Sequence, residues 1–146
     1  MRGWVYVITN PAMPGLVKVG YSTKDPSIRA KELDHTGSPL PYVVEYDVIV
    51  ESPYDIEQKI HIKLNKYHVG KEWFRCKPEE AVVAIHEMVK ETALLENFRH
   101  VSRDNINSLQ QHHLEEERIK NKNEERDRRS DRFEAELSYI TNIKYR

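Results

Sequence analysis

The chain has 146 residues and a formal net charge of −1, and 32% of its residues are charged while 38% are hydrophobic. This length predicts one domain, or a small domain with an appendage, and the balanced charge argues against a surface that binds nucleic acid everywhere, although it allows a local basic patch. The single cysteine, Cys76, excludes an internal disulfide and a cysteine-based zinc cluster.

The N-terminal stretch predicts a β-hairpin. Two apolar runs rich in β-branched and aromatic residues, Trp4–Ile8 and Leu16–Tyr21, flank a turn-rich linker, Asn10–Gly15. Each run carries one polar, titratable side chain, Tyr6 on the first and Lys18 on the second. A phenol and an amine that face each other across a hairpin form a candidate site.

A helix and a strand are expected next. Asp25 is a favourable N-cap and Pro26 suits the first helical position, so we expect a helix that runs to about Asp34. The following strand, Pro41–Val50, alternates in a way that is typical of a sheet covered on one side. One face of this strand would carry Tyr42, Val44, Tyr46, Val48 and Val50.

A second helix carries two further candidate residues. Ser52-Pro53-Tyr54-Asp55 has the pattern of a capping box, and the helix is expected to reach about Tyr67. Glu57 lies at the edge of its apolar stripe, and His61 lies one turn further on the same side. The alternatives are a Glu that only favours the helix dipole and a solvated His. The apolar stripe consists of Ile56, Ile60, Leu64 and Tyr67.

The remaining segments predict the end of the domain and an extension. A short strand, Glu72–Cys76, and a helix from Pro78 close the compact domain near residue 95. Residues 101–146 hold ten Lys/Arg, ten Asp/Glu and no Gly or Pro, which predicts one or two long solvated helices. Their final apolar residues would dock on the domain, meet a partner or form a homo-oligomer with a second copy.

The order of these elements predicts an α+β fold in two parts. Residues 1–95 would form a small three-stranded antiparallel or mixed sheet flanked by helices, and residues 96–146 a charged C-terminal helical extension. The chain shows neither a signal peptide nor a stretch of about 20 apolar residues, so we expect a cytoplasmic protein that does not enter a membrane.

The hairpin resembles the GIY-YIG endonuclease superfamily. Trp4-Val5-Tyr6 stands where the family has Gly-Ile-Tyr, Lys18-Val19-Gly20 stands where it has Tyr-Ile-Gly, and Asn10 lies four residues after Tyr6. Lys in place of the second motif Tyr is similar to a phage and bacterial branch of the superfamily. The resemblance covers residues 3–90 and implies a GIY-YIG-like fold and a metal-dependent endonuclease that hydrolyses phosphodiester bonds in DNA, with RNA open as a second substrate.

The resemblance also implies the site residues. Arg29 would hold the scissile phosphate and Glu57 one Mg²⁺ or Mn²⁺ ion, while Tyr6 and Lys18 would activate water. A free phenol has a pKa of about 10, so Tyr6 needs a nearby cation to act as a base, and Lys18 is the candidate. His61 would orient Glu57 or contact phosphate. The expected nucleic-acid contacts are Lys18, Lys24, Arg29 and Lys31.

Three alternatives stay open. The same fold can bind nucleic acid or a protein partner without catalysis, and the C-terminal helices can make the chain a structural module. Lys59, Lys63 and Lys66, on the far flank of the second helix, form either a phosphate track or a solvated face. Glu72, at the start of the short strand, would act on the site only indirectly.

Overall fold

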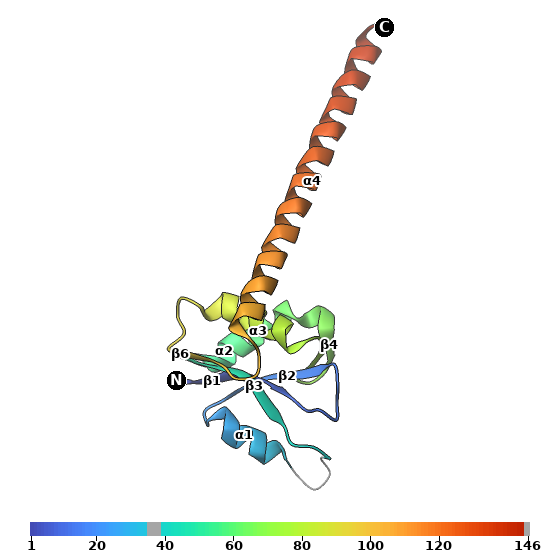
Figure 1. The fold of residues 1–146 in the computed structure, drawn as a ribbon. Coiled ribbons are helices and arrows are strands. Elements are labelled where there is room, and N and C mark those ends of the chain that lie inside the picture. The colour runs from blue at the N-terminus through green and yellow to red at the C-terminus, as the bar shows by residue number, and fades with distance from the viewer. Residues whose placement is uncertain (35–38, 145–146) are drawn as a thin grey trace. The chain divides into compact units, whose positions relative to one another are not determined.

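A computed structural model describes residues 1–34 and 39–144. Within these residues, six strands form one antiparallel sheet in the order β4-β5-β2-β1-β3-β6 (Figure 1). The strands are β1 (Gly3–Thr9), β2 (Leu16–Ser22), β3 (Val43–Val50), β4 (His68–Gly70), β5 (Trp73–Arg75) and β6 (Leu95–Phe98). The helices are α1 (Pro26–Leu33), α2 (Pro53–Lys63), the 3₁₀ helix η1 (Asn65–Tyr67), α3 (Pro78–Val89) and α4 (Arg103–Lys144).

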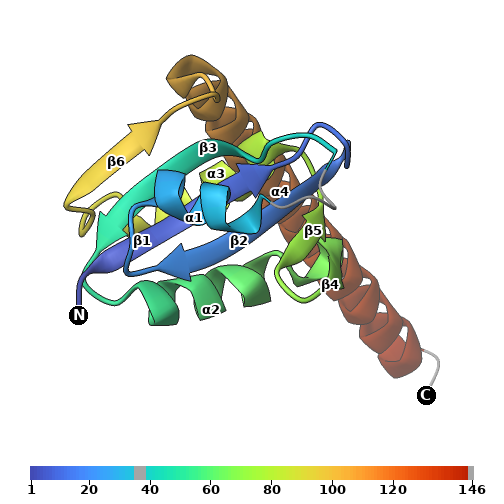
Figure 2. The ribbon, with the colours of Figure 1, turned by 90° about the horizontal axis from the view of Figure 1, so that it is seen from below.

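Both faces of the sheet are covered by helices. Figure 2 shows α1 on the near side of the strands and α3 on the far side. Successive residues of a strand point to opposite faces, so Val5 and Val7 of β1 pack with α2 and α3 while Tyr6 and Ile8 pack with α1. The side chains that carry the chemistry of the hairpin therefore lie on the α1 face.

A β-bulge changes the pattern expected for β3. Val7 pairs with Tyr46 but Ile8 pairs with Val44, which leaves Glu45 as the extra residue. Val44 therefore packs with Ile8 on the α1 face, whereas Tyr46 belongs to the core on the other face. The expectation that Val44 and Tyr46 share one face was wrong, because alternation is interrupted at the bulge.

The α+β class is confirmed, but the described residues contain six strands where we expected three. The three further strands are β5, which lies within the short strand expected at Glu72–Cys76, and β4 and β6, which have three and four residues and lie at the sheet edges. Helix α2 ends at Lys63 rather than Tyr67, and α3 ends at Val89. Ser52 is the N-cap of α2, yet in this described segment its side chain makes no capping hydrogen bond, so the capping-box interpretation was wrong.

Strand β6 is held by polar contacts on both faces of β3. Asp47, which is fully buried, accepts hydrogen bonds from Asn97 Nδ2 at 2.9 Å and from Arg99 Nε. On the other face, the Tyr46 hydroxyl donates to Glu96 Oε1 at 2.5 Å. These contacts add to the backbone pairing between β3 and β6, which joins β6 to the same sheet as the hairpin.

The chain divides into two compact units, Met1–Leu109 and Gln110–Arg146. Residue 95, the boundary that we expected, is the first residue of β6, and Ile106 in the first turns of α4 is fully buried in the core. Residues 103–144 form one helix. Within the described ranges, none of the helices combines the length and the apolar character needed to cross a membrane.

Candidate active site

The candidate site is built around Val19, where the pairing of β2 with β5 ends. Its backbone N–H donates to the Glu72 carbonyl at 3.0 Å, and its own carbonyl lies 2.9 Å from His61 Nε2. One edge of β2 is therefore completed partly by the turn before β5 and partly by a side chain of α2. This arrangement brings three segments that are distant in sequence to the middle of the hairpin.

Tyr6 and Gly20 are directly opposed on β1 and β2. Tyr6 is 1% exposed, and a Cβ built on Gly20 would lie 2.6 Å from the Tyr6 hydroxyl. Atoms cannot approach so closely, so the phenol occupies the space that any side chain at position 20 would need. These two residues are also the two that are identical to the motif of the resemblance.

The Tyr6 hydroxyl meets Arg29 of α1. Burial raises the pKa of the phenol above 10.0, while the hydrogen bond from the Arg29 guanidinium opposes this effect. The negative charges of Glu72 and Glu57 also raise the Tyr6 pKa. Tyr6 is therefore a protonated phenol at neutral pH, and Arg29 is the neighbouring cation that favours its ionisation.

Arg29 is oriented by its own helix. The Asp25 side chain accepts a hydrogen bond from the Ser27 N–H at 2.8 Å and so caps α1. Arg29 Nη1 donates to Glu32 Oε2 at 3.2 Å, and Lys24 Nζ lies 2.7 Å from the other oxygen of the same carboxylate. Glu32 thus holds two of the four cations that we expected to contact nucleic acid.

Glu57 places a nearly buried carboxylate beside these groups. Its side chain is 2% exposed, its Oε2 accepts from Gln58 Nε2 at 2.9 Å, and its Oε1 lies 2.7 Å from His61 Nε2. Burial raises the Glu57 pKa, and the hydrogen bond from Gln58 and the charge of His61 lower it. The same His61 nitrogen faces the Val19 carbonyl, which can only accept, so Nε2 carries the proton.

Lys18 lies on the same strand face as Gly20 but does not oppose Tyr6. Its strand partners are Ile8 and Trp73, so the prediction that Lys18 and Tyr6 face each other directly was wrong. The partner of Lys18 on β1 is Ile8, two residues after Tyr6, so Lys18 lies on the expected face of the sheet but pairs with a different residue. The Lys18 ammonium lies 3.3 Å from Glu72 Oε2, and the Lys18 side chain is 13% exposed.

The structure brings most of the expected residues together. Tyr6 and Arg29 are in contact, as are Glu57 and His61, and Glu72 links Lys18 to both pairs through its charge. Lys24 and Lys31 are exposed around α1. Sequence reasoning missed Gln58, which carries no signal beyond its place next to Glu57.

The donor set fits a hard divalent cation only loosely. In the described part of the chain, no group of three or more His, Cys, Asp or Glu side chains is arranged to hold a metal ion. Glu57 offers one carboxylate, and each of its oxygens keeps a lone pair beyond the hydrogen bond that it already accepts. Such a set suits an ion that keeps most of its water ligands, as Mg²⁺ does.

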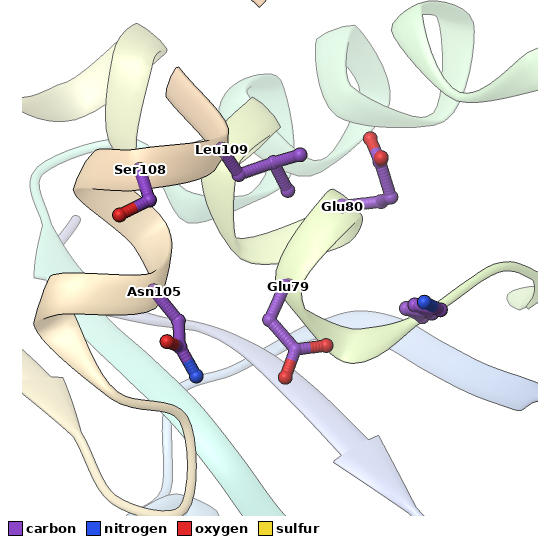
Figure 3. Close-up of a pocket in the computed structure, with 6 residues that line it drawn as sticks. Glu79, Glu80, Asn105, Ser108 and Leu109 are labelled. Carbon is purple, nitrogen blue, oxygen red and sulfur yellow. The ribbon is translucent and has the colours of Figure 1, made fainter. Parts of the chain in front are cut away.

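A separate pocket of about 430 Å³ lies between α3 and the first turns of α4. Figure 3 shows Glu79 and Asn105 extending into the space between these helices, with Ser108 and Leu109 on the α4 side. Its two acidic side chains, Glu79 and Glu80, disfavour a phosphate group, and its lining contains none of the expected site residues. We therefore place the chemistry at the hairpin and not in this pocket.

Comparison with known proteins identifies the family of the chain. A family model described as the T5orf172 domain matches residues 3–90, which include every strand of the site and both α1 and α2. No curated protein and no solved structure matches the chain.

Proposed function

The chain belongs to the T5orf172 domain family, which is associated with nuclease-type domains, and from this premise we propose that it is a GIY-YIG-type endonuclease that cleaves DNA with the help of a divalent cation. The observation that carries the proposal is the convergence of Tyr6, Arg29 and Glu57 on the part of β2 next to Gly20. These side chains come from β1, α1 and α2, so only the fold assembles them.

The roles follow from the chemistry of each group. Phosphodiester hydrolysis needs charge neutralisation on the phosphate, an oriented water molecule and help for the leaving oxygen. Arg29 offers a planar, permanently charged fork for the phosphate, next to the Tyr6 hydroxyl. Glu57 would hold one Mg²⁺ or Mn²⁺ ion, which would add positive charge at the phosphate when bound.

Tyr6 and Lys18 would activate the water. In the free protein the raised pKa keeps the Tyr6 hydroxyl protonated, so it orients a water molecule through hydrogen bonds. Removal of a proton from that water by Tyr6 would require its pKa to fall, and Arg29 is the group that acts in this direction. Lys18 contributes a positive charge from the neighbouring position of the same strand face.

The test is a nicking and cleavage assay on supercoiled plasmid with Mg²⁺ or Mn²⁺. We expect the wild-type protein to cut, a chelator to stop it, and Glu57→Gln and Arg29→Lys each to lose activity on the order of 100-fold. Glu87→Gln is a control outside the candidate site, because Glu87 is also an acid on a helix but is more exposed than Glu57 and pairs with Lys63, whose Nζ lies 3.0 Å away.

A binding module would give a different result. If gel shifts show that wild type, Glu57→Gln and Arg29→Lys bind DNA equally and none of them cuts it, the endonuclease proposal fails. Cleavage that survives in both variants would also contradict it, since the two residues would then have no part in the reaction.

A further inference from the structure

Glu72 has no part in the mechanism given above, yet its carboxylate pairs with Lys18 and its carbonyl accepts a hydrogen bond from Val19. We propose that Glu72 is a positioning residue that acts through Lys18: its carboxylate fixes the Lys18 ammonium on the strand face next to Tyr6, ready to meet the substrate phosphate. The inference rests on the proposed endonuclease function, because it assigns the residue that prepares Lys18 for that reaction.

The first argument is the ion pair itself. Lys18 Nζ lies 3.3 Å from Glu72 Oε2, and the two side chains are 13% and 38% exposed. A mostly buried ammonium needs a counter-charge, because desolvation disfavours an isolated ion. The neighbouring carboxylate of Glu57 is already engaged by His61 and Gln58, so Glu72 is the acid that holds Lys18.

The second argument is that the backbone fixes Glu72 on both sides. Its carbonyl accepts from the N–H of Val19, the residue after Lys18, and the next residue, Trp73, pairs with Lys18 across β2 and β5. Lys71, just before it, has a φ of 47°, in the left-handed region that non-glycine residues rarely adopt. A turn that keeps such a conformation without glycine holds the following residue in a defined place.

The third argument is electrostatic. The Glu72 charge raises the pKa of Tyr6 and that of Glu57, so its carboxylate lies within range of both groups. A negative charge at this place repels a phosphodiester and weakens DNA binding. A carboxylate that opposes binding and still lies in the site is explained if its benefit comes in the chemical step, through Lys18.

The experiment separates binding from cleavage. Glu72→Gln keeps the shape and removes the charge, so we expect DNA affinity equal to or higher than that of wild type and a single-turnover cleavage rate about 10-fold lower. Lys18→Met and the double variant complete a double-mutant cycle, in which Glu72→Gln should add no further loss once Lys18 is gone. Glu87→Gln, which removes an acid of similar exposure from its pair with Lys63, should leave both measurements unchanged.

Three results would overturn the inference. Equal cleavage by Glu72→Gln and wild type would remove any role in the reaction. Additive losses in the double variant would show that Glu72 does not act through Lys18. A loss of DNA binding in Glu72→Gln as large as its loss of cleavage would overturn the inference as well, because a positioning role predicts binding at least as tight as in wild type.

A readout that needs no cleavage keeps this inference distinct from the proposed function. The rate at which an amine-acylating reagent labels Lys18, followed by mass spectrometry, should rise severalfold in Glu72→Gln and stay at the wild-type value in Glu87→Gln. If the wild-type protein cuts no DNA, the endonuclease proposal fails, whereas an unchanged labelling rate in Glu72→Gln contradicts the ion pair on which the inference depends.

Discussion

At the scale of single residues, the position of the Tyr6 ring requires a glycine at position 20. The buried phenol lies across β2 at the point where a side chain of residue 20 would begin, which places its hydroxyl next to Arg29. Glycine is needed here for close approach and not for an unusual backbone conformation. The Tyr6 hydroxyl can take this position because Gly20 has no side chain.

Gly20→Ala tests this relation. The new Cβ would lie 2.6 Å from the Tyr6 hydroxyl, so the ring must move within a packed environment, at a cost of about 1–3 kcal/mol in the free energy of unfolding. We expect lower stability in urea denaturation and a cleavage rate at least about 10-fold lower. Gly70→Ala is the control, because a Cβ there would meet no described atom within 4 Å. Equal effects at both positions would contradict the close approach.

For Glu57, also a single residue, burial disfavours the ionised form that the proposed metal binding requires. Burial raises its pKa, so the folded state holds the Glu57 proton more tightly than the unfolded chain does. The stabilising contribution of this proton is complete below the unfolded pKa of about 4.5 and is lost as the pH rises through the folded pKa. As the pH rises above 4.5, this contribution declines, because the unfolded chain gives up the Glu57 proton more readily than the folded protein does.

Glu57→Gln should consequently be more stable than wild type at pH 7 and should lose this advantage as the pH falls towards 4. Urea denaturation at both pH values, in the presence of a chelator, measures the difference, and the same variant should not cut DNA. A variant that is less stable than wild type at pH 7 would mean that the bonds from His61 and Gln58 to the carboxylate outweigh the cost of burial.

At the scale of elements, the site depends on short segments with defined ends. Helix α1 has eight residues, too few to be stable in isolation, and it carries Arg29. Its start is defined by the Asp25 cap, whereas the start of α2, at Ser52, has no such side-chain bond in the structure described for residues 39–144. We therefore expect the Asp25 side chain to contribute more to the stability of its helix than the Ser52 side chain does.

Asp25→Ala should lower the free energy of unfolding by about 1 kcal/mol, because it removes the acceptor of the Ser27 N–H. It should also slow cleavage, since the first turn of α1 orients Arg29. Ser52→Ala should change stability by less than about 0.5 kcal/mol. Thermal or urea unfolding of both variants checks the comparison, and a larger loss for Ser52→Ala would reverse our assignment of the caps.

At the scale of the whole molecule, the two compact units suggest different roles. The first unit, Met1–Leu109, contains the complete site and its core, and the second, Gln110–Arg146, is helical over its described residues. We propose that the second unit serves association with another copy or a partner rather than the reaction, because its described side chains are almost all exposed.

Two truncated chains test this division. A chain of residues 1–109 should fold and keep the cleavage rate of the full chain, and it should lose any concentration-dependent self-association seen by analytical ultracentrifugation. A chain of residues 1–95 should be less stable by about 3 kcal/mol or more, because buried Asp47 loses the partners Asn97 and Arg99. If residues 1–95 fold as stably as residues 1–109, β6 does not contribute to the stability of the domain.

Sequence reasoning identified the local elements and the types of residue in the site. Two apolar runs around a turn-rich linker predicted the hairpin, and hydrophobic alternation predicted β3. Capping residues predicted α1 and the apolar stripe predicted α2, because all of these signals act between residues that are close along the chain. Strand β6 was missed, since its four residues become a strand only through pairing with β3.

The sequence by itself determined the α+β class, the hairpin, and the candidates Tyr6, Lys18, Arg29 and Glu57. Only the tertiary structure decided which of them meet. Register placed Gly20, and not Lys18, opposite Tyr6, and the turn before β5 supplied Glu72 as the partner of Lys18. The physical reason is that strand register and the contacts of β2 with α2 and β5 depend on packing between distant segments, which no local pattern encodes.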